Sequence, residues 1–181
     1  HNPEYEVTLR TAYGMNFLYL LIEVNSDTII YRDRAYQNGD GFHLTVAKPE
    51  DNDRPSSEFY VLRFSPENTS KKTPARTGVW YYNMDLQSKA LSEKALFKAA
   101  AHDRKIYYEA LIPWNDIRPY HPLFGPIGFN LCFVKAVGTT EKNYYFLLRD
   151  DDMQSEMRMR KYVISHFAQP DRVKELQTFC A

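Results

Sequence analysis

The sequence predicts an all-β fold: an antiparallel β-sandwich of the immunoglobulin or jelly-roll type, with about ten strands and a short C-terminal helix. Short runs of β-forming residues recur along the chain and are separated by turn residues. Aromatic residues make up 15% of the chain, with 14 Tyr and 11 Phe, and such residues are enriched in strands. The 181 residues contain no internal repeat, low-complexity tract or linker, so we expect a single domain over residues 1–181.

The first half of the chain is typical of consecutive strands. Residues 5–13 alternate between apolar and polar side chains, and residues 17–24 form an apolar run after a turn at Gly14 and Asn16, which together predict a hairpin. Loops are expected where Gly, Pro, Asn and Asp are concentrated, at residues 33–41, 49–57 and 65–78. Further strands are expected at residues 28–32, 42–46, 58–65 and 79–84.

Residues 88–101 are ambiguous, because their Ala, Leu, Lys and Glu content favours a helix. However, a polar turn at residues 102–105 leads directly into a clear strand at residues 106–112, and that strand needs a hairpin partner before the turn. We therefore predict a strand at residues 95–101. After it we expect a short helical turn at residues 113–117, strands at 128–137, 144–148 and 162–167, and a helix at 171–179 that starts just after Pro170.

The composition argues against several classes of function. The 23 Lys and Arg balance the 23 Asp and Glu, so no positive field favours a nucleic-acid partner. The longest apolar run, residues 17–22, is far shorter than the roughly 20 residues of a membrane span. No Gly-x-Ser-x-Gly, Gly-rich phosphate loop or His-Glu-x-x-His is present, so we expect a protein that is not an enzyme. The sequence does not exclude a catalytic pair of carboxylates, but it singles out no such pair.

The two cysteines, Cys132 and Cys180, fit no metal or redox spacing. Either they form a disulfide that ties down the C-terminal tail or they are unrelated thiols, and the sequence leaves both open. The first residue is His1, and no charged region followed by an apolar segment is visible, so a signal peptide is absent or already removed.

Three segments, taken in order, resemble family 9 of the carbohydrate-binding modules. Residues 11–24, Thr-Ala-Tyr-Gly-Met-Asn-Phe-Leu-Tyr-Leu-Leu-Ile-Glu-Val, look like the opening hairpin of that family. Residues 38–46, Asn-Gly-Asp-Gly-Phe-His-Leu-Thr-Val, occupy the place of its Asp-Ser-Val-Glu strand. The most specific piece is Tyr-Tyr-Glu-Ala-Leu-Ile-Pro-Trp at residues 107–114 followed by Ile-Gly-Phe-Asn at 127–130, which is similar to the family's Glu-x-x-Ile-Pro-Trp and Gly-Phe-Asn block. The resemblance covers roughly residues 5–167 and implies the same β-sandwich, an architecture shared with DOMON-type sandwiches.

The resemblance implies a non-catalytic module that holds a saccharide between aromatic rings, with planar polar groups at its hydroxyl rim. Tyr36 matches the position of the first aromatic ring, and Arg63 matches the sugar-contacting Arg. Ser65 stands where Asn is usual, and His43 replaces the expected Glu.

Other aromatic residues give further candidates. Alternation along a strand turns Trp80 and Tyr82 to one face, so we include both among the carbohydrate-binding candidates. Trp114, beside Pro113 at the end of a strand, is expected to be structural. The loop that should supply the family's second Trp contains instead Met153, Met157 and Met159.

Clustered carboxylates are the ligands that Ca²⁺ prefers, and the chain offers them at Asp150, Asp151 and Asp152 and at Asp51 and Asp53. Because the resembled family often carries structural calcium, we expect no cofactor other than such an ion.

The resemblance also implies partners and a location. We expect the chain to bind a mono- or oligosaccharide, such as a glycan terminus, and to be part of or partner to a secreted glycan-processing protein, through a covalently linked enzymatic domain. The implied location is secreted, periplasmic or at the cell surface. Two alternatives stay open: a heme-binding DOMON-type domain with Met and His as axial ligands, and a structural or docking sandwich that has lost its ligand.

Overall fold

The computed structural model describes residues 5–32, 39–49, 55–68, 70–82, 87–139, 141–148 and 163–165. Two 3₁₀ turns, η1 (Trp114–Ile117) and η2 (Pro122–Phe124), connect β8 to β9. No helix in these ranges is long and apolar enough to cross a membrane. The strands are β1 (Val7–Tyr13), β2 (Phe17–Val24), β3 (Gly41–Pro49), β4 (Pro55–Ser65), β5 (Arg76–Tyr82), β6 (Gln87–Lys89), β7 (Leu96–His102), β8 (Lys105–Pro113), β9 (Ile127–Val137), β10 (Glu141–Phe146) and β11 (Val163–Ser165).

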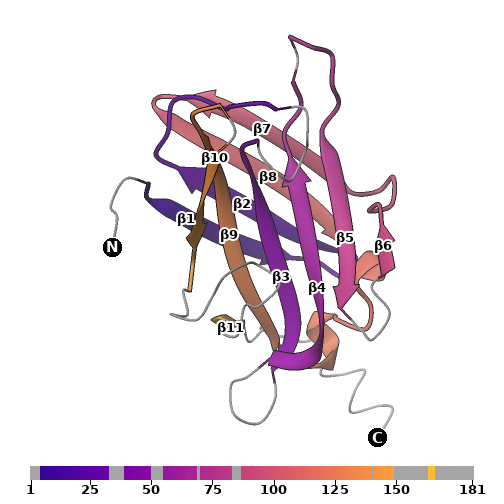
Figure 1. The fold of residues 1–181 in the computed structure, drawn as a ribbon. Helices are drawn as coiled ribbons and strands as arrows, with labels where there is room; N and C mark the ends of the chain where they lie inside the picture. The colour runs from indigo at the N-terminus through magenta and orange to yellow at the C-terminus, as the bar shows by residue number, and fades with distance from the viewer. Residues whose placement is uncertain are drawn as a thin grey trace, which may run out of the picture.

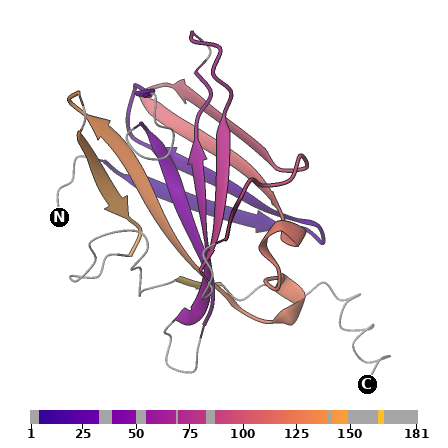
Figure 2. The same ribbon diagram turned by 45° about the vertical axis from the view of Figure 1, so that its right-hand side comes forward.

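The strands form two antiparallel sheets, and the small sheet lies across the back of the large one in Figure 1. The small sheet has four strands in the order β1-β2-β8-β7. The large sheet has seven strands, six of them in the order β10-β9-β3-β4-β5-β6, with β11 paired to β9. Figure 2 shows the two layers from a second side, with η1 and η2 at one end of the sandwich. The predicted all-β sandwich is confirmed.

Alternating side chains from both sheets fill the space between them. Phe42 on β3 and Phe64 on β4 stack with ring centroids 4.4 Å apart. Phe97 and Tyr108, from the small sheet, stack on each other at 6.1 Å and meet the edge of this pair. Each such aromatic pair adds about 0.5–1.5 kcal/mol beyond the burial of its apolar area. The high Phe and Tyr content of the sequence therefore serves, in part, to join the two sheets.

The expected hairpins are confirmed, including the strand at residues 95–101 that competes with a helical propensity. Phe97 and Ala99 pack against the core from β7, while Leu96 and Lys98 are exposed. This alternation fits a strand that covers one face of a core, and the pairing with β8 satisfies the backbone. Tertiary packing thus overrides the local preference for a helix.

The expected strand at residues 28–32 is wrong. The amide of Ile30 donates to Asp40 Oδ2 at 2.9 Å, and the amide of Asp40 donates to the carbonyl of Ile30 at 2.9 Å. One residue thus supplies both partners of Ile30, and no strand ladder runs along this segment.

Smaller differences concern short elements and ends of strands. The sequence analysis missed β6 and η2, which are only 3 residues each. β4 and β10 begin at Pro55 and Glu141, before the expected residues 58 and 144. The expected helix at residues 171–179 lies outside the described residues, and β11 falls within the expected strand at 162–167.

Candidate functional site

Two of the predicted site residues are neighbours on the large sheet. His43 on β3 lies opposite Arg63 on β4 and opposite Cys132 on β9. The residues before and after them, such as Phe42 and Phe64, belong to the core, so His43 and Arg63 lie on the other face of the sheet. The His43 side chain is only 1% exposed, whereas Arg63 is partly exposed.

The next row of the same face carries two polar residues that the sequence analysis missed. Thr45 on β3 lies opposite Asn130 on β9, and both are fully buried. The Asn130 amide donates to the carbonyl of Leu148 at 2.9 Å, and the amide of Leu148 donates to Asn130 Oδ1 at 3.3 Å. Buried polar groups require such partners. A signal existed, because Thr45 and Asn130 are polar residues inside otherwise apolar strands.

The register places Trp80 and Tyr82, on β5, opposite Val61 and Phe59 of β4. Trp80 therefore belongs to the row of Val61, Thr45 and Asn130 across the sheet. Several of the other predicted site and metal residues lie outside the described residues: Tyr36, Asp51, Asp53, Asp150, Asp151 and Asp152.

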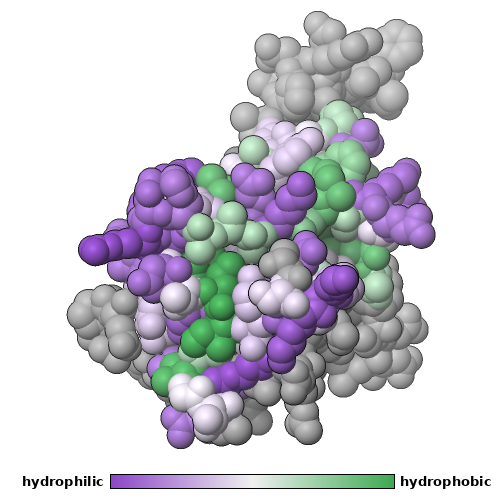
Figure 3. Space-filling model, turned by 90° about the horizontal axis from the view of Figure 1, so that it is seen from above, coloured by the Kyte–Doolittle hydropathy of each residue, from purple (hydrophilic) through white to green (hydrophobic). Residues whose placement is uncertain are grey.

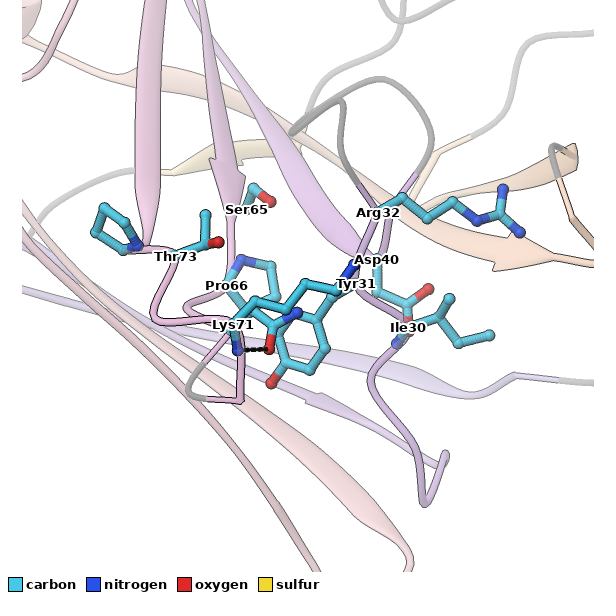
Figure 4. Close-up of a pocket in the computed structure, with 11 residues that line it drawn as sticks. Ile30, Tyr31, Arg32, Asp40, Ser65, Pro66, Lys71 and Thr73 are labelled. Carbon is cyan, nitrogen blue, oxygen red and sulfur yellow. Dashed lines mark hydrogen bonds between the residues drawn. The ribbon is translucent and has the colours of Figure 1, made fainter.

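Ser65, the last residue of β4, lines a cavity of about 160 Å³. The arrowhead of β4 marks this end of the sandwich at the top of Figure 1. Figure 3 looks down on this end, where hydrophilic residues flank a narrow band of hydrophobic ones. Ser65 is thus separated from Arg63 by one residue of β4 and adjoins a hollow in the surface. The cavity is also lined by Ile30, Tyr31, Arg32, Gly39, Asp40, Pro66, Asn68, Lys71, Thr73 and Pro74 (Figure 4).

Asp40, which lines this cavity, belongs to a buried ion pair. Lys135 Nζ donates to Asp40 Oδ2 at 2.6 Å and to the carbonyl of Thr28 at 2.7 Å. Asp40 Oδ1 accepts the amide of Ala136 at 2.7 Å. Because Asp40 and Lys135 are 1% and 3% exposed, this carboxylate acts as a structural anchor and is not presented to a ligand.

Arg32 also has a structural role. Its guanidinium donates to the carbonyls of Val137 and Gly138 at 2.7 Å and of Glu141 at 2.9 Å. It thereby holds the turn between β9 and β10, and Figure 4 shows its side chain extending away from Ser65 and Thr73.

Tyr31 is the aromatic residue of the cavity. Burial raises the pKa of its phenol, and the charges of Asp40 and Glu67 raise it further. Tyr31 is therefore a neutral hydroxyl at pH 7 that can donate a hydrogen bond. Together with the hydroxyls of Ser65 and Thr73, it gives the cavity the polar lining that a hydroxyl-rich molecule needs.

Metal ligation is not apparent in the part of the chain that the structure describes. Within it, no group of three or more His, Cys, Asp or Glu side chains is arranged to hold a metal ion. The expected calcium ligands lie in other residues, so calcium stays a prediction. The same is true of the bridge between Cys132, which is buried on β9, and Cys180, which lies outside the described residues.

No protein-family model matches this sequence, and no curated protein matches it. Solved structures do match. A family 9 carbohydrate-binding module from Caldicellulosiruptor kristjanssonii in complex with cellotriose has a TM-score of 0.52 at 16% identity, covering 80% of this chain and 65% of that chain. The same kind of module in complex with glucose has a TM-score of 0.50 at 16% identity, covering 80% of this chain and 66% of that chain. The fold is that of a family 9 carbohydrate-binding module.

Within this family 9 fold, the motif residues have clear structural places. Trp114, in the Ile-Pro-Trp motif, is 3% exposed, and its indole Nε1 donates to the carbonyl of Gly14 at 2.9 Å. The expectation that Trp114 is structural is confirmed. The chain spans about 65% of the length of the matched modules, so the match concerns the sandwich and not the whole of those chains.

Proposed function

We propose that this chain is a non-catalytic carbohydrate-binding module for a mono- or oligosaccharide. The observation that carries the proposal is the shared fold, because the similar modules are solved in complex with cellotriose and with glucose. The neighbouring positions of Arg63, His43 and Ser65, next to a cavity with a hydroxyl lining, support it.

The chemistry of these side chains suits a sugar. A pyranose ring has an apolar face of C–H groups and a rim of hydroxyls, so it needs an aromatic ring and planar hydrogen-bonding groups. In this proposal, Arg63 donates to the hydroxyl rim, as a guanidinium with its fixed fork of donors can. Ser65 forms a hydrogen bond to the sugar at the edge of the cavity, and Tyr36 stacks on the face of the sugar ring. Trp80 or Tyr82 makes a further contact with the sugar. His43, which is buried beside Arg63, positions that side chain.

The wider role that we propose is that of an accessory domain. The module directs a glycan-processing protein, through a covalently linked enzymatic domain or as a separate partner, to its substrate. Such a role requires a location where extracellular glycans occur: secreted, periplasmic or at the cell surface. A structural calcium ion at Asp150, Asp151 and Asp152 would stabilise the module.

Calorimetric titration with glucose and with cellotriose tests the binding. We expect Tyr36→Ala to lower the affinity by about ten- to 150-fold, which corresponds to the roughly 1.5–3 kcal/mol of burying one aromatic side chain. Arg63→Ala should cost a similar amount, because a charge-assisted hydrogen bond is lost.

The matched control is Arg10→Ala, which removes an exposed Arg from the other sheet, where it pairs with Glu23. This variant should bind like the unaltered chain. A panel of sugars that gives no heat with the unaltered protein would contradict the proposal and favour the docking alternative. Affinity that survives Tyr36→Ala and Arg63→Ala but is lost in a folded Trp80→Ala variant would move the site toward β5.

A further inference from the structure

A second hollow lies at the end of the sandwich where β1 turns into β2. Its volume is about 500 Å³, within the range of small-ligand sites, and Met15, Asn115, Arg118, His121 and Phe124 are among its lining. Figure 2 shows η1 and η2 gathered at this end. β9 starts three positions after Phe124, and its 11 residues extend about 35 Å toward the Ser65 cavity, so the two hollows lie at opposite ends of the strand.

Phe124 presents an aromatic ring to solvent from a fixed backbone. Its side chain is 79% exposed. Its amide donates to the carbonyl of His121 at 3.0 Å, and its ring lies against the His121 ring with centroids 5.7 Å apart. Because the backbone that carries this ring is already ordered, a ligand that covers the ring does not have to order the loop as well.

His121 connects this turn to the rest of the fold. Its Nδ1 accepts the amide of Leu123 at 3.2 Å, and its Nε2 lies 3.0 Å from the carbonyl of Met15. Because an N–H faces one ring nitrogen and a carbonyl faces the other, the proton must reside on Nε2. The imidazole thus joins η2 to the β1–β2 turn and fixes the floor between Phe124 and Met15.

The polar side of the hollow is a planar pair. Arg118 donates from Nε at 3.0 Å and from Nη2 at 2.6 Å to Asn115 Oδ1. This pairing orders both side chains, and it leaves the amide nitrogen of Asn115 and Nη1 of Arg118 out of the pair. The exposed ring of Phe124 therefore lines the same hollow as two planar groups with N–H donors.

We infer that this hollow is a second carbohydrate-binding site, in which one pyranose ring stacks on Phe124 and its hydroxyl oxygens accept hydrogen bonds from Asn115 and Arg118. The inference rests on the proposed function, since it assigns the same class of ligand. The alternative occupant is a protein. Among the described residues that line this hollow, Met15 and Phe124 are the exposed large apolar side chains, whereas a standard protein interface involves about 20–30 residues a side.

The test is a nuclear magnetic resonance titration of the 181-residue chain, labelled with nitrogen-15, with glucose, xylose, cellotriose and xylotriose in turn. With at least one sugar, we expect shifts of the Asn115 side-chain amide and of the Leu123 and Phe124 backbone amides. Phe124→Ala should raise the dissociation constant obtained from these shifts by at least about ten-fold. Phe124→Tyr keeps a ring and should change that constant by no more than about three-fold. Leu96→Ala removes another exposed apolar side chain, 60% exposed on β7, and should leave them unchanged.

The outcomes separate the two proposals. Shifts around Arg63 and Ser65 without any around Phe124 would overturn this inference and keep the proposed function. Shifts around Phe124 alone would support it and move the main site away from Arg63. An unchanged response in a folded Phe124→Ala variant would overturn it. The inference would also be overturned if none of the four sugars perturbs residues 115–124 and a protein partner binds the unaltered chain but not the Phe124→Ala variant.

Discussion

Asp40 is the residue on which one end of the sandwich depends. Its buried carboxylate joins residues 28–30 to β9 through Ile30, Lys135 and Ala136. We expect Asp40→Ala to lower the free energy of unfolding by about 3–5 kcal/mol, because it leaves the Lys135 ammonium buried without its counter-charge. Urea denaturation measures this loss, with Glu93→Ala, at an exposed carboxylate, as the control. A loss below about 1 kcal/mol would show that Lys135 finds another partner or water.

Tyr108 gives a pH-dependent prediction. Its ring is fully buried, and no partner among the described residues reaches its hydroxyl. Burial, with added contributions from the charges of Asp40 and Tyr31, holds the pKa of this phenol well above its usual value. Above about pH 10 the unfolded chain releases this proton and the folded chain keeps it, so the free energy of unfolding falls as pH rises.

The slope due to this one group is at most about 1.4 kcal/mol per pH unit, and its contribution is fully present below about pH 10. Tyr108→Phe should reduce the alkaline loss of stability and leave stability at pH 7 unchanged or higher, since an unpaired buried hydroxyl is removed. Urea denaturation at pH 7 and at pH 10.5 makes the comparison. Parallel pH profiles for the two proteins would contradict the assignment.

At this scale, the sequence could name neighbouring residues of the candidate site, and their binding of a sugar stays a prediction. Arg63 and His43 were each placed by resemblance, and the register brings them side by side. Asp40 lies in the expected loop at 33–41 and in the motif at 38–46, but its role as an anchor could not be predicted. Its partners Lys135 and Ala136 are far away in sequence and become neighbours only through the pairing of β3 with β9. Phe124 was not recognised because a single aromatic residue between Leu123 and Gly125 carries no periodic pattern.

At the scale of elements, the β7–β8 hairpin has a turn that its sequence does not favour. Asp103 and Arg104 have φ angles of 50° and 60°, which are the two positive values of a type I′ turn, and Asn-Gly is the preferred pair there. We expect Asp103→Asn combined with Arg104→Gly to stabilise the protein by about 1 kcal/mol, or about 2–4 °C in Tm. Calorimetry measures the shift. Arg104→Ala keeps a Cβ in the left-handed region, so this control should not raise Tm. A lower Tm for the Asn-Gly variant would contradict the turn assignment.

Elements with local signals were predicted well, and those that depend on distant partners were not. Alternation and turn residues sufficed for the β1–β2 hairpin, and β7 followed from the need of the clear strand β8 for a partner across a short turn. Residues 28–32 have the composition of a strand, yet the Asp40 side chain takes a position that a neighbouring strand would otherwise fill. β3 lies between β4 and β9, an order that no local pattern encodes.

At the scale of the whole molecule, the two sheets are joined both in the middle and at one end. In the middle, the aromatic group of Phe42, Phe64, Phe97 and Tyr108 connects the large sheet to the small one. At the end, the segment between β8 and β9 bonds to both sheets: the Trp114 indole donates to the carbonyl of Gly14, which follows β1, and the Tyr60 hydroxyl on β4 donates to the carbonyl of Arg118 at 2.5 Å. This leaves the outer faces and the loops at both ends to vary without loss of the sandwich, and the candidate binding residues lie there.

The approach of β3 to β4 at Gly41 has a consequence for how this fold evolves. A Cβ built at Gly41 would lie 2.2 Å from the carbonyl oxygen of Phe64, a backbone atom that cannot move aside. Every substitution at this position must therefore separate the two central strands, whatever the chemistry of the new side chain. Substitutions elsewhere can remove nearly all recognisable sequence similarity between two such chains, but Gly41 is constrained because no Cβ fits at this position. A homologue that keeps these strands in the same register is expected to keep this glycine.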